Sequence, residues 1–72
     1  MMDEGELYNR FTYHPPTEEQ VRAYERIREE ALAFALLLNI YCPESREKST
    51  ALTKLDECVM HANASIARHT NA

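Results

Sequence analysis

The feature that most restricts the fold of this chain is its shortage of residues that break a helix. Its 72 residues include one glycine and three prolines, and no proline follows Pro43. So little glycine leaves almost no turn chemistry, which argues against an all-β fold with many tight turns. A hydrophobic content of 44% argues against a disordered chain, and the length allows one domain at most.

The first long helix is predicted to begin at Thr17 and to end near Cys42. Thr17 and Gln20 have the spacing of a capping box, in which each residue satisfies a backbone N–H of the other. No glycine or proline lies between Thr17 and Pro43, and Pro43 ends the predicted helix. Along this segment apolar residues recur at intervals of three and four, at Tyr24, Ile27, Ala31, Phe34, Leu38 and Tyr41.

A second helix is predicted from Ser45, its capping residue, to about His69. Its apolar positions show the same spacing at Leu52, Leu55, Val59, Ala62 and Ile66. Helices joined by a short connection pack as antiparallel neighbours. We therefore expect an all-α fold, with a polar, partly extended N-terminal arm over residues 1–16 and an antiparallel two-helix hairpin over residues 17–72. The two helices are expected at about 17–42 and 45–69.

This hairpin is expected to assemble into a homo-oligomer. A chain this short rarely forms a core that contributes more than ~3–5 kcal/mol. Cys42 and Cys58 are too few for a disulfide scaffold and read as free thiols, as in a reducing cytosol. Residues 31–41 are apolar on nearly every side except at Asn39, so one helix cannot cover them. The expected contacts between chains are Phe34, Leu37, Leu38, Ile40 and Tyr41.

Several partners and chemistries are not expected. The longest apolar run, residues 31–38, is far shorter than the ~20 residues of a membrane span. A net charge of −4 without a basic stripe argues against binding a nucleic acid polymer. Cys58 and His61 share a helix face, but two ligands do not make a metal site. With no glycine-rich loop and no nucleophile–base arrangement, we expect no enzyme, no metal and no cofactor.

Aromatic and basic residues are predicted to gather at the base of the hairpin, where the first long helix starts and the second ends. Phe11, Tyr13 and His14 come from the arm. Aromatic faces stack on nucleobases, at ~1–3 kcal/mol per base, and guanidinium groups bind phosphate. This combination suits a small nucleotide. The same residues have a purely structural explanation. The aromatics would hold the arm against the hairpin, and the arginines would pair with neighbouring glutamates. The arginines placed at or toward the base are Arg10, Arg22, Arg26, Arg28 and Arg68.

The segment 45–50 at the hairpin tip also has two interpretations. Free amide groups, hydroxyls and the cations Arg46 and Lys48 could hold an anion there. An ordinary solvated helix start, capped by Ser45, accounts for the same residues and is the favoured interpretation.

Four segments, taken together and in this order, resemble a known family. They are residues 11–16 (FTYHPP), 42–49 (CPESREKS), 51–55 (ALTKL) and 62–68 (ANASIAR). They look like the small phage helical-hairpin proteins that counter CBASS immunity, the anti-CBASS cyclic-nucleotide sponges, which are related to the Thoeris anti-defence proteins. The resemblance covers roughly residues 8–69.

The resemblance implies a specific function. Such proteins are hexamers that sequester the cyclic dinucleotides and cyclic trinucleotides of bacterial defence without cleaving them, in separate pockets between protomers. Tyr13 matches the arm aromatic that stacks on bases. Arg26 or Arg28 matches the basic residue that meets phosphate, and Arg68 matches an arginine of the trinucleotide pocket. The expected location is the cytoplasm of the infected bacterial host. The alternative is a phage structural or interaction hairpin that docks a host protein and binds no nucleotide.

Overall fold

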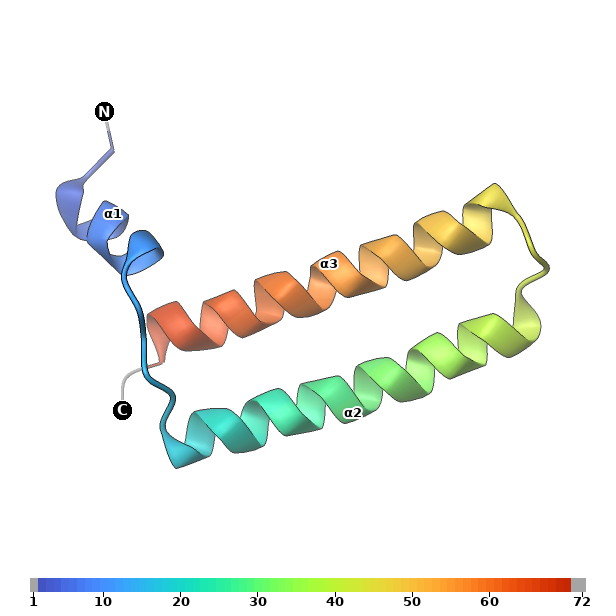
Figure 1. Ribbon diagram of the computed structural model, residues 1–72, viewed down its shortest axis with the longest axis horizontal. Helices are drawn as coiled ribbons and strands as arrows, with labels where there is room; N and C mark the ends of the chain where they lie inside the picture. Colours follow the sequence, from blue (N-terminus) through green and yellow to red (C-terminus); the bar gives the residue numbers. More distant parts are fainter. Residues whose placement is uncertain (1, 71–72) are drawn as a thin grey trace.

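The computed structural model describes residues 2–70, and this part of the chain contains three helices and no strand. Helix α1 spans Glu4–Phe11, α2 spans Glu18–Tyr41 and α3 spans Arg46–His69. Figure 1 shows α2 and α3 as antiparallel neighbours, with α1 beside the C-terminal end of α3. The all-α prediction is confirmed, and the two long helices begin and end within one residue of their predicted positions.

The prediction of a partly extended arm was wrong for residues 4–11, which form α1. Acidic residues Glu4 and Glu6 lie in the first turn and Arg10 lies in the last, an arrangement that complements the helix dipole. Leu7 and Phe11 are four residues apart and share one face. Pro15 and Pro16 favour extended geometry, but they lie beyond the end of α1, in the non-helical segment of residues 12–16 that joins α1 to α2.

The line of α2 that faces α3 also differs from the prediction at two positions. Phe34 and Tyr41 are exposed, whereas Ala35 and Cys42 are half-buried in their place. A helix with 3.6 residues per turn drifts relative to a seven-residue repeat, so the buried line passes to the next residue. The half-buried residues of α3 include all of the predicted ones, Leu52, Leu55, Val59, Ala62 and Ile66.

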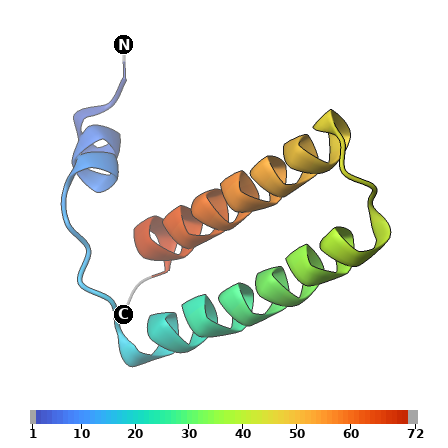
Figure 2. The ribbon, with the colours of Figure 1, turned by 45° about the vertical axis from the view of Figure 1, so that its right-hand side comes forward.

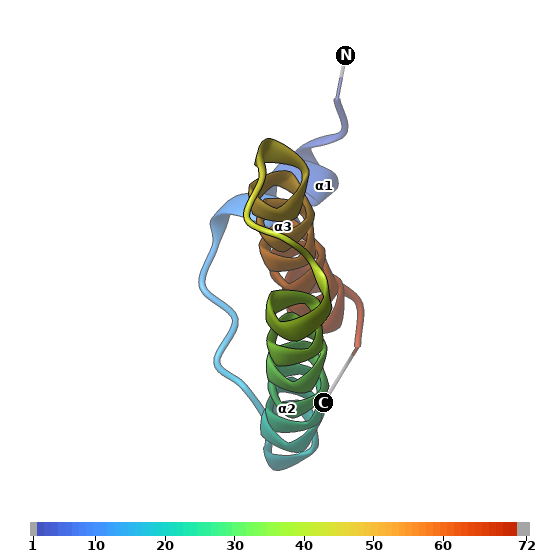
Figure 3. The same ribbon diagram turned by 90° about the vertical axis from the view of Figure 1, so that its right-hand side faces the viewer.

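The molecule is a slab one helix thick. Its principal extents are 45 × 33 × 13 Å. The end-on view in Figure 3 places α3 directly over α2, with no further layer of helices on either side. Within residues 2–70 no apolar residue is buried, and the only buried residues are Gln20 and Lys48, at 8% and 7% exposure. A single chain therefore has no hydrophobic core of its own.

Polar side chains tie the two long helices together at both ends. At the base, the Gln20 amide donates to the carbonyl oxygens of Ile66 (3.2 Å) and Thr70 (2.9 Å). At the tip, the Lys48 ammonium donates to the carbonyl of Asn39 (3.2 Å) and to the carboxylate of Glu44 (2.5 Å). The Asn39 carbonyl lies in the last turn of α2 and has no partner within that helix, whereas the Ile66 carbonyl also accepts from the Thr70 N–H at 3.2 Å.

Candidate functional site

The linker between α1 and α2 runs across the base of the hairpin (Figure 2). Pro15 and Pro16 favour extended backbone there. His14 is half-buried, and its Nε2 donates to the Asn9 carbonyl at 2.6 Å. This bond folds the linker back onto the end of α1, so the position of the linker depends on that of α1.

Polar contacts fasten α1 to the end of α3. The Asn9 side-chain amide donates to the Arg68 carbonyl at 3.1 Å, and the Arg68 guanidinium donates to the Arg10 carbonyl at 3.5 Å. A polar hollow of about 200 Å³ opens between these elements. His14 and Arg68, both predicted site residues, line this hollow together. The full lining is Asn9, His14, Pro15, Gln20, Ala67, Arg68 and Thr70.

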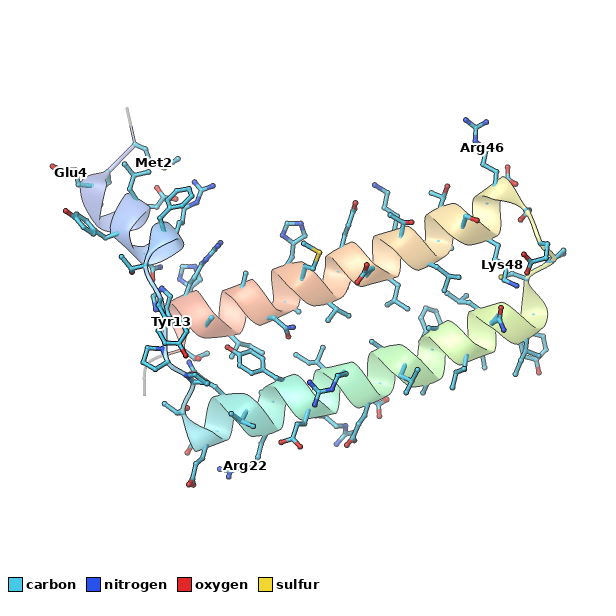
Figure 4. All side chains as sticks on the ribbon, in the orientation of Figure 1. Met2, Glu4, Tyr13, Arg22, Arg46 and Lys48 are labelled. Carbon is cyan, nitrogen blue, oxygen red and sulfur yellow. The ribbon has the colours of Figure 1, made fainter. Side chains whose placement is uncertain are left out.

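Tyr13 and Phe11 are not buried within the chain. Their exposed fractions are 83% and 76%, so neither ring pins the arm to the hairpin within one copy. Figure 4 shows Tyr13 on the linker at the base, beside the mouth of the hairpin. The Arg10 guanidinium lies 5.7 Å from the centre of the Phe11 ring, at cation–π distance. Phe11 therefore has a local partner for its ring, whereas Tyr13 remains an available stacking surface.

The predicted grouping of the helix-one arginines at the base was wrong for Arg28. Arg28 lies about 16 Å along the helix from Thr17, at 1.5 Å per residue, and lines an apolar groove in the middle of the hairpin. Arg26 is exposed and forms an ion pair with Glu30 at 3.5 Å. Pairing with a neighbouring glutamate was the alternative to phosphate binding that the sequence allowed. Arg22 points from the outer edge of α2, away from α3 (Figure 4).

The structure does not gather the tip cations into an anion site. Arg46 points outward from α3, whereas Lys48 points back toward the end of α2 (Figure 4). The Ser45 hydroxyl accepts from the Lys48 backbone N–H at 3.1 Å, so it serves as an ordinary helix cap.

Within residues 2–70 no group of three or more potential metal ligands occurs, and no helix is long and apolar enough to cross a membrane.

Sequence reasoning missed the second role of Gln20. The capping box is present as predicted, with Thr17 N–H donating to the Gln20 side chain at 2.9 Å and Gln20 N–H donating to the Thr17 hydroxyl at 3.1 Å. The Gln20 amide nitrogen also reaches Thr70 and lines the hollow. The sequence carries one signal of this second role. The third residue of the helix is glutamine, whose amide can donate a hydrogen bond, and not glutamate, the other common residue of a capping box, which cannot.

A chain with this arrangement, a thin helical hairpin with an arm folded across its base, has a counterpart among known families. A family model described as the Acb2/Tad1 hairpin domain matches residues 3–67, nearly the whole chain. The protein therefore belongs to the Acb2/Tad1 hairpin family, the anti-CBASS and anti-Thoeris cyclic-nucleotide sponges. This is a family of binding domains and not a known enzyme family. No curated protein and no solved structure matches the chain significantly.

Proposed function

We propose that this protein binds and sequesters the cyclic di- and trinucleotide messengers of bacterial CBASS defence, for a phage, in the cytoplasm of the infected host. Family membership over residues 3–67 is the observation that carries the proposal. The exposed Tyr13 face, and the hollow that Arg68 shares with His14, supply the stacking and phosphate-binding chemistry that such ligands need. The net charge of −4 favours a small anion over a nucleic acid polymer.

The proposed dinucleotide site combines residues of two copies in a homohexamer. Tyr13 lies at the base, whereas Arg28 lies in the middle of the hairpin. Because Arg28 lies about 16 Å along α2 from Thr17, at 1.5 Å per residue, we infer that the Arg28 guanidinium and the Tyr13 ring of the same chain do not share one small ligand. Tyr13 of one copy and Arg28 or Arg26 of another would share it, and Arg68 would serve the trinucleotide.

Calorimetry of the purified protein against a panel of cyclic di- and trinucleotides tests the proposal. Linear dinucleotide and duplex DNA serve as controls. We expect saturable binding of at least one cyclic ligand, and recovery of that ligand chemically intact after the protein is denatured. No binding across the panel would favour a hairpin that docks a host protein, and linear products in proportion to protein would overturn sequestration.

Crossed variants test the residue roles separately from the function. Arg28→Ala should weaken the binding of cyclic dinucleotides through the loss of charge-assisted bonds to phosphate, and Arg28→Lys should retain more of it. Arg68→Ala should act mainly on cyclic trinucleotides. If both alanine variants bind both ligand classes like the parent, the residue assignment is wrong even where sequestration is right.

A further inference from the structure

The groove in the middle of the hairpin contains a carboxylate as well as the Arg28 guanidinium. Arg28 comes from α2 and Asp56 from α3, and every other residue that lines the groove is apolar, Leu32 and Val59 among them. The groove has a volume of about 250 Å³. Pockets that enclose a drug-sized ligand measure roughly 300–1,000 Å³. This groove therefore suits one part of a cyclic dinucleotide, such as a base with its neighbouring phosphate, and not the whole ligand.

The Asp56 carboxylate is not used by the fold of the single chain. Asp56 is exposed and forms no ion pair with any of residues 2–70, Arg28 included. Its own helix offers no cation at the spacing that allows pairing, because the residues three and four positions away are Leu52, Thr53, Val59 and Met60. The next residue, Glu57, differs in this respect, since its carboxylate pairs with Lys54 at 3.4 Å.

A carboxylate beside a phosphate-binding guanidinium restricts which base can lie there. An ionised carboxylate repels phosphate, and its two oxygens only accept hydrogen bonds. Guanine alone among the common bases presents two adjacent donors, N1–H and N2–H, on one edge. Adenine and cytosine present one amino group beside a ring nitrogen that accepts, and the N–H of uracil lies between two carbonyl oxygens. Each of these bases would therefore set a lone pair against a carboxylate oxygen.

We propose that Asp56 makes this groove selective for guanine, so that the protein prefers cyclic dinucleotides that contain guanine. Arg28 binds a phosphate, and the two oxygens of the Asp56 carboxylate accept from N1–H and N2–H of the adjoining base. The apolar walls of the groove keep water away from these bonds and so strengthen them. This inference rests on the proposed function, with Arg28 as the phosphate contact, and adds to it the base that is recognised.

Two adjacent carboxylates of α3 make a matched pair of probes. Asp56→Asn removes the charge in the groove, whereas Glu57→Gln removes the same charge one residue further on, outside the groove. Calorimetry measures the affinity of each protein for cyclic di-GMP and for cyclic di-AMP. Native mass spectrometry and circular dichroism compare the assembly mass and helix content with those of the parent.

The parent is expected to bind cyclic di-GMP about 10- to 150-fold more tightly than cyclic di-AMP, because hydrogen bonds to a charged group are the strong ones. Asp56→Asn should weaken the binding of cyclic di-GMP and strengthen that of cyclic di-AMP, since an amide can accept from the adenine amino group and donate to its ring nitrogen. Glu57→Gln should keep the ratio of affinities that the parent shows.

The possible failures are distinguishable. Equal affinities of the parent for the two ligands, or the same ratio in Asp56→Asn and Glu57→Gln, would overturn base selection by Asp56 and leave sequestration intact. Binding of neither ligand by the parent would overturn the proposed dinucleotide site together with this inference. Loss of the parent's assembly mass in Asp56→Asn alone would assign the carboxylate to a contact between copies, which also overturns the inference.

Discussion

Tyr13 presents the most exposed large aromatic side chain among residues 2–70, and its exposed fraction is 83%. Tyr13→Ala should therefore leave the fold unchanged but remove one stacking face per site. The expected cost is ~1–3 kcal/mol, about 5- to 150-fold in affinity for cyclic nucleotides. Tyr13→Phe keeps the ring and should cost much less. Calorimetry measures the affinity of both variants, once each is shown to keep the assembly mass and helix content of the parent. Equal losses of affinity in the two variants would contradict stacking.

Gln20 should be intolerant of the isosteric change to Glu. A carboxylate still accepts from Thr17 N–H and suits the helix start, but it cannot donate to the carbonyls of Ile66 and Thr70. Loss of these buried bonds should destabilise the protein by about 1–3 kcal/mol. Urea unfolding of Gln20→Glu measures this, with Glu19→Gln as the exposed neighbouring control. Equal midpoints for the two variants would show that the clamp contributes nothing.

At the scale of residues, the sequence was informative only about near neighbours. The Thr17–Gln20 capping box could be predicted because its partners are three residues apart. The bond from Gln20 to Thr70 could not, because its partner is fifty residues away and depends on how α2 and α3 align. Arg28 was misplaced for a different reason: the arginines were grouped by residue type, although eleven residues of the predicted helix at 1.5 Å each already place Arg28 about 16 Å from Thr17.

The tip between α2 and α3 should give the protein a small pH dependence. The hydrogen bond from Lys48, followed by its charge, lowers the pKa of Glu44 below the ordinary 4.5. A lowered pKa in the folded state means that the ionised carboxylate stabilises the fold above the ordinary pKa. That stabilisation is lost as pH falls through the lowered value.

Comparison of the parent with the Glu44→Gln variant tests the direction of this pH dependence of stability. The parent should be slightly more stable at neutral pH, and the difference should vanish in acid. The Glu44 carboxylate is exposed, so the difference should also shrink as salt is added. Denaturant midpoints of both proteins across pH and salt measure it, and a difference that grows toward acid would contradict the assignment.

At the scale of elements, the long helices were predictable and α1 was not. Capping residues, Pro43 and the regular apolar spacing define α2 and α3 from local information alone. Helix α1 is only eight residues long, and an isolated helix of that length is marginal in water. Its hydrogen bonds from Asn9 to Arg68 and from His14 to Asn9 depend on the folded base of the hairpin.

For the whole molecule, the absence of a hydrophobic core within residues 2–70 predicts that folding depends on assembly. The thermal midpoint should rise with protein concentration, because association stabilises only the folded state. Leu38→Glu should abolish both assembly and helix content, since it places an unpaired charge between α2 and α3. Scanning calorimetry over a wide concentration range, with native mass spectrometry, measures both. A midpoint independent of concentration would show that the lone hairpin is stable.

The two polar clamps also restrict how this chain can change in length. Gln20 and Asn39 mark the clamped ends of α2, and Lys48 and Ile66 mark those of α3, at separations of nineteen and eighteen residues. A deletion within one helix would pull one clamp out of reach, and at 3.6 residues per turn it would also rotate one apolar stripe away from its partner. Insertions and deletions between the clamps are therefore tolerated only as matched whole turns in both helices, whereas the arm lies outside the clamped spans and is free of this coupling.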